Sequence, residues 1–245
     1  MHGCFPSISG APDVVTVDHA LWYVVAMFWA YFDESGLHAP QVNGGGLRKL
    51  TVAGCIADEE AWNQLSVDWS AALSMWGLPV FHMVDFENRV APYNKWTPAE
   101  RKERLNILLE IIGRTKAHCC GFTNIVRSDD NTAKVYERCV YDTFLELSMN
   151  WDEKFSIVFA HHPEYGKQEH LYTEMLAHGL RDQAMSCTIG HPINVVPLQA
   201  ADIVAYEICK DERMGDEREK LTPRRYPLER LFALGCPFRL SSAVE

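Results

Sequence analysis

The sequence is poor in basic residues and has no paired-cysteine motif, and each absence excludes a class of protein. Its 23 Lys and Arg residues are outnumbered by 33 Asp and Glu residues, which gives a net charge of −10. This balance argues against a general nucleic-acid coat protein, since phosphate contacts need a basic surface. It does not exclude an enzyme acting on nucleic acid, because an acidic metal site adds to the negative charge.

The eight cysteines form no CxxC pair, and most lie inside apolar segments. This pattern predicts buried thiols of a reducing compartment rather than a disulfide framework. Cys119 and Cys120 are adjacent and could be redox-active, but their segment has the pattern of a strand, which favours a packing role.

The sequence also has no apolar run long enough to cross a membrane. Residues 21–32 are apolar but too short to span a bilayer. They follow Asp13 and Asp18 rather than the basic region of a signal peptide. We therefore expect a soluble, cytoplasmic protein with no membrane partner.

No internal repeat or low-complexity segment divides the chain. With 245 residues, 47% of them hydrophobic, a single domain with one sizeable core is the simplest expectation. Residues 1–24 mix Gly, Pro, Ser and Asp and are expected to form an irregular arm. Residues 25–245 are expected to form the domain, with a charged connector at 210–225 and a short helix at 227–234.

Strand and helix patterns alternate along this domain, which predicts an α/β fold. Strands are expected near 25–33, 49–57 (antiparallel to the first), 79–84, 117–126, 155–160 and 184–189, and helices near 58–76, 97–112, 131–150, 169–178 and from 197 onward. The clearest local signal is Thr97-Pro98-Ala99-Glu100, a capping box with proline in the first turn. Gly44, Gly45 and Gly46 lack a following Gly-Lys-Ser or Gly-Lys-Thr, so a flexible loop is favoured over a phosphate-binding loop.

Two acids end the first apolar run. Asp33 and Glu34 follow a segment rich in aromatic residues, and Gly36 permits the turn after them. Side chains alternate along a strand, so we expect only one of the two carboxylates to face a given site. The alternative is a solvated strand end before a hairpin turn.

A third acid lies in a helix that is apolar on nearly all sides. Asp202 is surrounded in sequence by Leu198, Ala201, Ile203, Val204, Ala205 and Ile208. Such a helix is buried, and a buried carboxylate must be protonated, paired or bound to a metal. The structural alternative is a hydrogen bond to Gln199, Tyr206 or a backbone amide.

Together these acids point to a metal site. Two carboxylates brought together from distant positions repel each other unless a cation lies between them. Mg²⁺ prefers oxygen ligands and is often held by one or two carboxylates plus water and phosphate. Two such ions can clamp the attacking and leaving oxygens of a phosphoryl displacement.

Three short motifs in this order resemble a known family. Residues 31–36 (YFDESG), 81–83 (FHM) and 197–202 (PLQAAD) are similar to the family catalogued as domain of unknown function 3800, and the resemblance extends over about 25–210. It implies a ribonuclease H-like fold, a mixed sheet flanked by helices, and a metal-dependent nuclease or related hydrolase. Asp33 and Asp202 would then ligate Mg²⁺ or Mn²⁺ and act in catalysis, with Glu34 as a third group. Further candidate acids are Asp85, Glu87 and Glu207.

One feature departs from that pattern. An acid is expected at the end of a later central strand, but residues 155–160 are followed by His161 and His162. Either His162 serves as a ligand or general base, or Glu164 reaches in, or the site is weakened. The alternative is that the two histidines simply begin a polar loop.

The sequence therefore supports two main functions. The first is a divalent-metal-dependent nuclease or phosphodiester hydrolase acting on RNA or DNA. The second is a non-catalytic ribonuclease H-like interaction module of a phage, mobile element or defence system. A zinc hydrolase using His82, His161, His162 or His170 has less support, because no HExxH spacing occurs and a lone histidine such as His82 is more often a core residue. A homodimer is compatible with the sequence.

Overall fold

The computed structural model describes residues 27–36, 48–127, 130–163, 184–217 and 226–242. The strands are β1 (Phe28–Ser35), β2 (Arg48–Asp58), β3 (His118–Val126), β4 (Phe155–Ala160), β5 (Ala184–Gly190) and β6 (Phe238–Ser242). The helices are α1 (Glu59–Trp76), α2 (Met83–Glu87), α3 (Pro98–Thr115), α4 (Thr132–Asn150), α6 (Pro197–Glu217) and α7 (Tyr226–Ala233), with a 3₁₀ turn at Tyr93–Lys95. The expected α/β fold is confirmed.

The strands form one mixed sheet in the order β5-β4-β1-β2-β3-β6. β1 is antiparallel to β2, as predicted, and β2 is antiparallel to β3. β4 lies on the other side of β1, parallel to it, and β5 is parallel to β4. The carboxyl ends of β1, β4 and β5 therefore lie at the same edge of the sheet, which places Asp33 and Glu34 close to the residues that follow β4.

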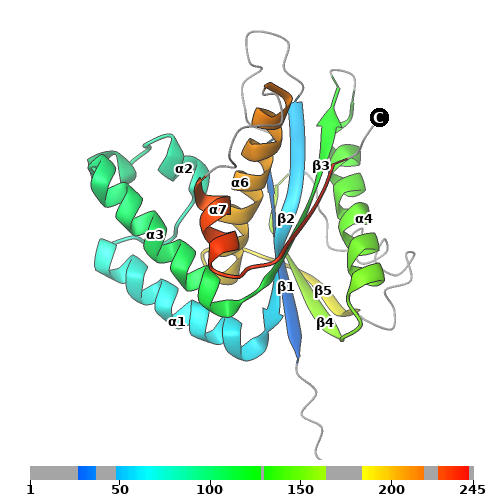
Figure 1. Ribbon diagram of the computed structural model, residues 1–245, viewed down its shortest axis with the longest axis horizontal. Coiled ribbons are helices and arrows are strands. Elements are labelled where there is room, and N and C mark those ends of the chain that lie inside the picture. The colour runs from blue at the N-terminus through cyan, green and yellow to red at the C-terminus, as the bar shows by residue number, and fades with distance from the viewer. Residues whose placement is uncertain (1–26, 37–47, 128–129, 164–183, 218–225, 243–245) are drawn as a thin grey trace, which may run out of the picture.

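Helices cover both faces of the sheet (Figure 1). The α1, α3, α6 and α7 helices form one layer with the larger core, which includes Trp69, Leu108 and Ile203. On the opposite face α4 packs Tyr136, Val140 and Phe144 against the sheet. We refer to these as the α6 face and the α4 face.

The residues of β1 alternate between the two cores. Trp29 and Tyr31 pack on the α6 face, whereas Ala30 and Phe32 are buried on the α4 face. Both faces of β1 are therefore covered by other elements, which explains why its sequence is apolar without alternation.

The predicted α1 helix has clear boundaries. The Asp58 side chain accepts a hydrogen bond from the Ala61 N–H at its start, and Gly77 ends it in the left-handed conformation at φ 67°. Trp62 and Trp69 are buried, so the tryptophans of this helix form a core face. The cap aspartate and terminal glycine are the signals that made this helix predictable.

The predicted capping box at Thr97 begins α3, but the helix end was misplaced. Gly113 does not stop the helix, which continues to Thr115 with Lys116 as its C-cap. A Cβ atom at Gly113 would lie 2.6 Å from the Leu234 Cβ. The glycine therefore allows close packing of α3 against the residue that follows α7.

The strand predicted at 79–84 is wrong. The chain there is irregular up to His82, and α2 begins at Met83. The N–H groups of Phe81, His82 and Met83 donate to the side chains of Gln199, Tyr93 and Asp202. Because these donors are used by side chains, they take no part in a strand ladder.

The charged connector expected at 210–225 does not begin at residue 210. Residues 210–217 continue α6 as helix, and the Lys49 Nζ donates to the Glu212 carbonyl at 2.9 Å. The β6 strand was not predicted. The expected arm at 1–24, the triple glycine, the expected helix at 169–178 and the rest of the connector lie outside the described residues. Within the described part of the chain, no helix has the length and apolar character needed to cross a membrane.

Candidate functional site

Asp33 lies near the carboxyl end of β1 on the α6 face. Its register partner on β2 is Ala53, a residue of the α6-face core, and α6 packs across both strands. The Asp33 Oδ1 accepts a hydrogen bond of 2.8 Å from the Glu34 N–H. The strand end thus directs one acid of the predicted pair toward the helix that carries Asp202.

Asp202 lies in the second turn of α6 and is 5% exposed. Its Oδ2 accepts a hydrogen bond of 2.7 Å from the Met83 N–H. The expected alternative partners, Gln199 and Tyr206, are engaged elsewhere: Gln199 bonds Trp69, Phe81 and Pro192, and Tyr206 interacts with Lys210. One backbone amide therefore compensates only part of the cost of burying this carboxylate.

The charge of Asp202 acts on both acids at the end of β1. Burial raises the pKa of Asp33 well above its usual range, and the charges of Glu34 and Asp202 raise it further. Burial also raises the pKa of Glu34, where the charge of Asp202 adds to the effect. Burial is likewise the main cause of the raised pKa of Asp202. Asp33, Glu34 and Asp202 thus form one acidic cluster, which we call the carboxylate cluster.

That only one of Asp33 and Glu34 faces a given site stays a prediction, since the side chains of β1 alternate between the two faces. The negative charge of Asp202 raises the pKa of both residues. β1 ends at Ser35, so both acids belong to the last residues of the strand. At a strand end, both neighbours remain within the field of one buried charge.

His162 lies beside Glu34, as the parallel pairing of β1 and β4 requires. Its Nε2 is 4.0 Å from the Glu34 Oε1, and its side chain is only 9% exposed. The structure therefore places the predicted His162 next to the carboxylate cluster. His161 is exposed and its ring packs against His191 at 4.2 Å between centroids.

His82 also lies near the cluster, although the sequence favoured a core position for it. Its side chain is about half exposed, and its Nδ1 is 3.3 Å from the Asp85 Oδ2. The charge of His82 lowers the pKa of both Asp202 and Glu34. The signal that could have indicated this was its place in the FHM motif, next to the residue whose N–H binds Asp202.

The remaining predicted acids occupy different positions. Asp85 pairs with His82, and its charge raises the pKa of Asp202, which places it at the rim of the cluster. Glu87 is paired with Lys210 at 2.7 Å and with Arg101 at 4.0 Å. Glu207 is buried on α6, about 140° around the helix from Asp202. These positions give Glu87 a structural role and separate Glu207 from the Asp202 side of α6.

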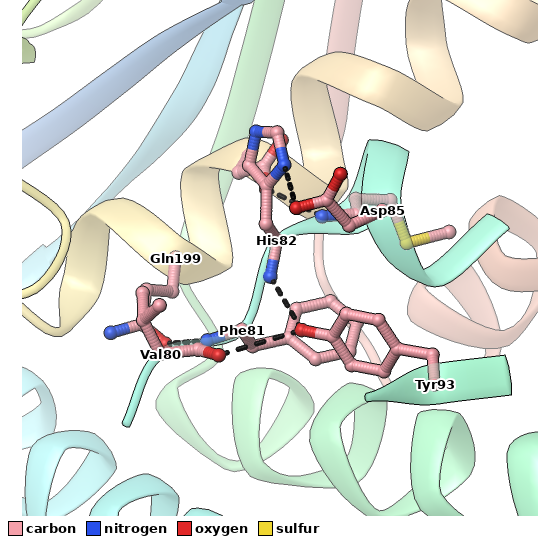
Figure 2. A network of polar contacts seen from close by, with 8 residues as sticks. Val80, Phe81, His82, Asp85, Tyr93 and Gln199 are labelled. Carbon is pink, nitrogen blue, oxygen red and sulfur yellow. Dashed lines mark hydrogen bonds and ion pairs between the residues drawn. The ribbon is translucent and has the colours of Figure 1, made fainter. Parts of the chain in front are cut away.

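A buried glutamine fixes the chain that leads to the cluster (Figure 2). The Gln199 Oε1 accepts from the Trp69 Nε1 at 3.0 Å and from the Phe81 N–H at 2.8 Å. Its Nε2 donates to the Pro192 carbonyl at 2.8 Å. In the same segment the His82 N–H donates to the Tyr93 hydroxyl at 3.1 Å. Gln199 and Tyr93 thereby hold His82 and Met83 beside Asp202, a positioning role that the sequence did not reveal.

The carboxylate cluster has the chemistry of a site for a hard cation. Carboxylate oxygens suit Mg²⁺ or Mn²⁺, and such ions are often held by one or two carboxylates completed by water and phosphate. Within the described ranges, however, no three or more His, Cys, Asp or Glu side chains are arranged to hold one ion. The cluster therefore fits an ion held by two protein carboxylates better than one enclosed by protein ligands.

Comparison with known proteins adds no identity to this description. No family model matches the sequence, and no curated protein matches it. The fold and the site define an α/β protein with a largely buried acidic cluster where β1 meets α6.

Proposed function

We propose that the protein is a divalent-metal-dependent phosphodiester hydrolase acting on RNA or DNA. The observation that carries this proposal is that two half-buried acids at the end of β1 lie within the field of one buried acid on α6, which raises the pKa of both. Asp33 and Asp202 would hold Mg²⁺ or Mn²⁺, and Glu34, the predicted third ligand, would instead lie beside His162. A mixed sheet with helices on both faces agrees with a ribonuclease H-like fold, which belongs to the same proposal.

The electrostatics of the cluster support a bound cation. Burial raises the pKa of all three carboxyl groups, and the charge of Asp202 raises that of Asp33 and Glu34 further, so their ionised forms are costly in the apo protein. A divalent cation would compensate that charge. When bound, such an ion supplies an activated water and stabilises charge on a phosphate oxygen.

The protein's own groups would divide the remaining work. The Met83 N–H orients Asp202 through its 2.7 Å hydrogen bond. His162, beside Glu34, is the proposed general base, since a neutral imidazole can take a proton from an attacking water. Asp85 is the proposed outer acid at the rim of the cluster.

The second candidate is a non-catalytic ribonuclease H-like interaction module. Two observations favour it: histidines rather than an acid follow β4, and the described residues contain no convergent set of three ligands. This candidate implies a protein with no metal affinity and a defined macromolecular partner.

Calorimetric titration with Mn²⁺ and Mg²⁺ distinguishes the two functions. The wild-type protein is titrated beside Asp33→Asn, Asp202→Asn and the control Glu103→Gln, which changes an exposed acid on α3. The hydrolase requires binding by the wild type and the control and its loss in both asparagine variants. Each titration is repeated with a short oligonucleotide present, because the substrate phosphate can complete the metal shell. Absence of binding in both series would support the interaction module, whereas undiminished cleavage by Asp33→Asn would overturn the assignment of catalysis to the carboxylate cluster.

A further inference from the structure

Two thiols face each other across neighbouring strands of the sheet. Cys55 on β2 and Cys119 on β3 are register partners in an antiparallel pair. Their Sγ atoms are 2.8 Å apart, although the residues are 64 positions apart in sequence. Both side chains are buried in the α6-face core, at 0% and 1% exposure.

We infer that Cys55 and Cys119 form an oxidative modification site, at which a hydroperoxide converts the two thiols into a cross-strand disulfide. Residues directly opposite in an antiparallel pair have Cα atoms about 4.5–5.5 Å apart, inside the range that disulfides span. The sulfur atoms must approach by less than about 1 Å to reach bonding distance. The register of β2 and β3 thus brings the two sulfurs to the threshold of bond formation.

Access to this site passes through the edge of the sheet. β6 is the outermost strand on that side of the described sheet, and it pairs with β3 from Cys119 onward. The Cys119 N–H donates to the Pro237 carbonyl at 2.9 Å, so the chain entering β6 is hydrogen-bonded to β3 at this residue. Burial raises the pKa of the Cys119 thiol, so oxidation follows local opening of this edge and is slow in the closed protein.

The reaction balances without a further reagent. Once local opening exposes Cys119 to solvent and its thiol ionises, the sulfur attacks one oxygen of hydrogen peroxide, the O–O bond breaks, and the departing hydroxide takes up a proton to become water. The resulting sulfenic acid is attacked by the Cys55 sulfur. The S–S bond forms as the S–O bond breaks, and a second water leaves. Two thiols lose two electrons and two protons in total, and the peroxide is reduced to two waters.

A third thiol lies close enough to compete. Cys236 hydrogen-bonds Cys119, and it precedes β6 in the same core. A disulfide between Cys119 and Cys236 would leave β2 unlinked. The experiment must therefore identify which cysteine is bonded to Cys119, in addition to measuring the loss of thiols.

The test is a disulfide map of the full-length protein after exposure to hydrogen peroxide. The protein is oxidised, denatured, alkylated and digested without reduction. We expect one peptide pair linked through Cys55 and Cys119, with two alkylatable thiols lost and regained after treatment with dithiothreitol. The disulfide map of the wild-type protein alone decides the proposal, so the test remains decisive even if a variant fails to fold.

Variants sharpen the assignment. Cys55→Ser and Cys119→Ser should each abolish the linked pair, whereas Cys236→Ser should retain it. Cys187→Ser is the matched control, because Cys187 is a buried thiol in the α4-face core. Full retention of all thiols, or linkage of Cys119 to any other cysteine, would overturn the inference. The outcome is independent of the proposed hydrolase activity.

Discussion

The position of Asp202 shows how one buried charge organises its surroundings. Its carboxylate is almost fully enclosed, and a single backbone N–H, that of Met83, donates to its Oδ2. The same charge raises the pKa of Asp33 and of Glu34. Asp202 thus has two separate effects: it repels the other two acids, and it accepts the hydrogen bond from Met83. Substitutions can distinguish them.

We predict opposite effects for two substitutions of Asp202. Asp202→Asn removes the charge and keeps an oxygen for the Met83 N–H, so stability at neutral pH without metal should stay unchanged or rise. Asp202→Ala leaves the buried N–H without its acceptor and should cost about 1–3 kcal/mol. Urea unfolding of both variants in the presence of a chelator measures the difference. Equal stabilities would show that the hydrogen bond contributes little.

The carboxylate cluster also predicts how stability depends on pH. Its folded-state pKa values are raised above those of the unfolded chain, so the folded protein binds more protons. The contribution of these groups to stability is fully present below the unfolded pKa values, at about pH 4. It is lost as the pH rises through the raised folded values.

Urea unfolding without metal, repeated from about pH 4 upward, should therefore show that the free energy of unfolding falls less with rising pH in Asp33→Asn than in the wild type. Mn²⁺ should reduce the decline in the wild type, because a cation compensates the ionised acids. Parallel curves for the two proteins would indicate that Asp33 titrates normally. Glu103→Gln, with its exposed side chain, is the control that should follow the wild type.

At the scale of elements, the segment before α2 depends on partners from other parts of the chain. Gln199 on α6 accepts from the Trp69 indole of α1 and from the Phe81 N–H. Tyr93 and Asp202 satisfy the next two backbone amides. This arrangement keeps residues 81–83 irregular and places His82 beside the acids.

We predict that Gln199→Leu destabilises the protein. The Trp69 and Phe81 donors would each lose a buried acceptor, at about 1–3 kcal/mol per donor. Denaturant unfolding should show this loss, whereas Gln64→Leu on the exposed face of α1 should change stability by at most about 0.5 kcal/mol. A loss in Gln199→Leu no larger than in the control would contradict the bridging role.

Prediction from sequence succeeded where the signal lies within one element and failed where distant contacts decide the structure. Strands β1, β2, β3 and β4 and helix α4 were predictable because their periodicity and caps lie within each element. The acids Asp33 and Asp202 were recognisable because carboxylates in apolar segments are unusual. Residues 79–84 look like a strand by local composition, and only contacts with distant side chains decide otherwise. For the same reason the proximity of His82 to the cluster could not be derived from its neighbours.

At the scale of the whole molecule, the sheet depends on close backbone approach at its centre. An added Cβ at Gly54 would lie 1.8 Å from the Tyr31 carbonyl oxygen on β1. No rotamer change relieves a clash with backbone, so the pairing of β1 and β2 would have to shift.

We therefore predict that Gly54→Ala abolishes cooperative unfolding or soluble expression. Gly77→Ala, at an open position with φ 67°, should cost only about 1–2 kcal/mol, the strain of an L-residue in the left-handed conformation. Thermal unfolding followed by circular dichroism compares the two variants. A native-like transition in Gly54→Ala would show that β1 and β2 can separate locally without loss of the sheet.

The placement of β1 between β2 and β4 has a consequence for synthesis of the protein. One edge of β1 can pair with β2 as soon as that strand emerges, but the other edge pairs with residues 155–159. Until that later strand has left the ribosome, the nascent chain presents an apolar strand with an open row of amides and carbonyls. Such long-range parallel pairing is slow and exposes the intermediate to aggregation. Efficient production in the cell should therefore depend on a chaperone that shields this edge during translation.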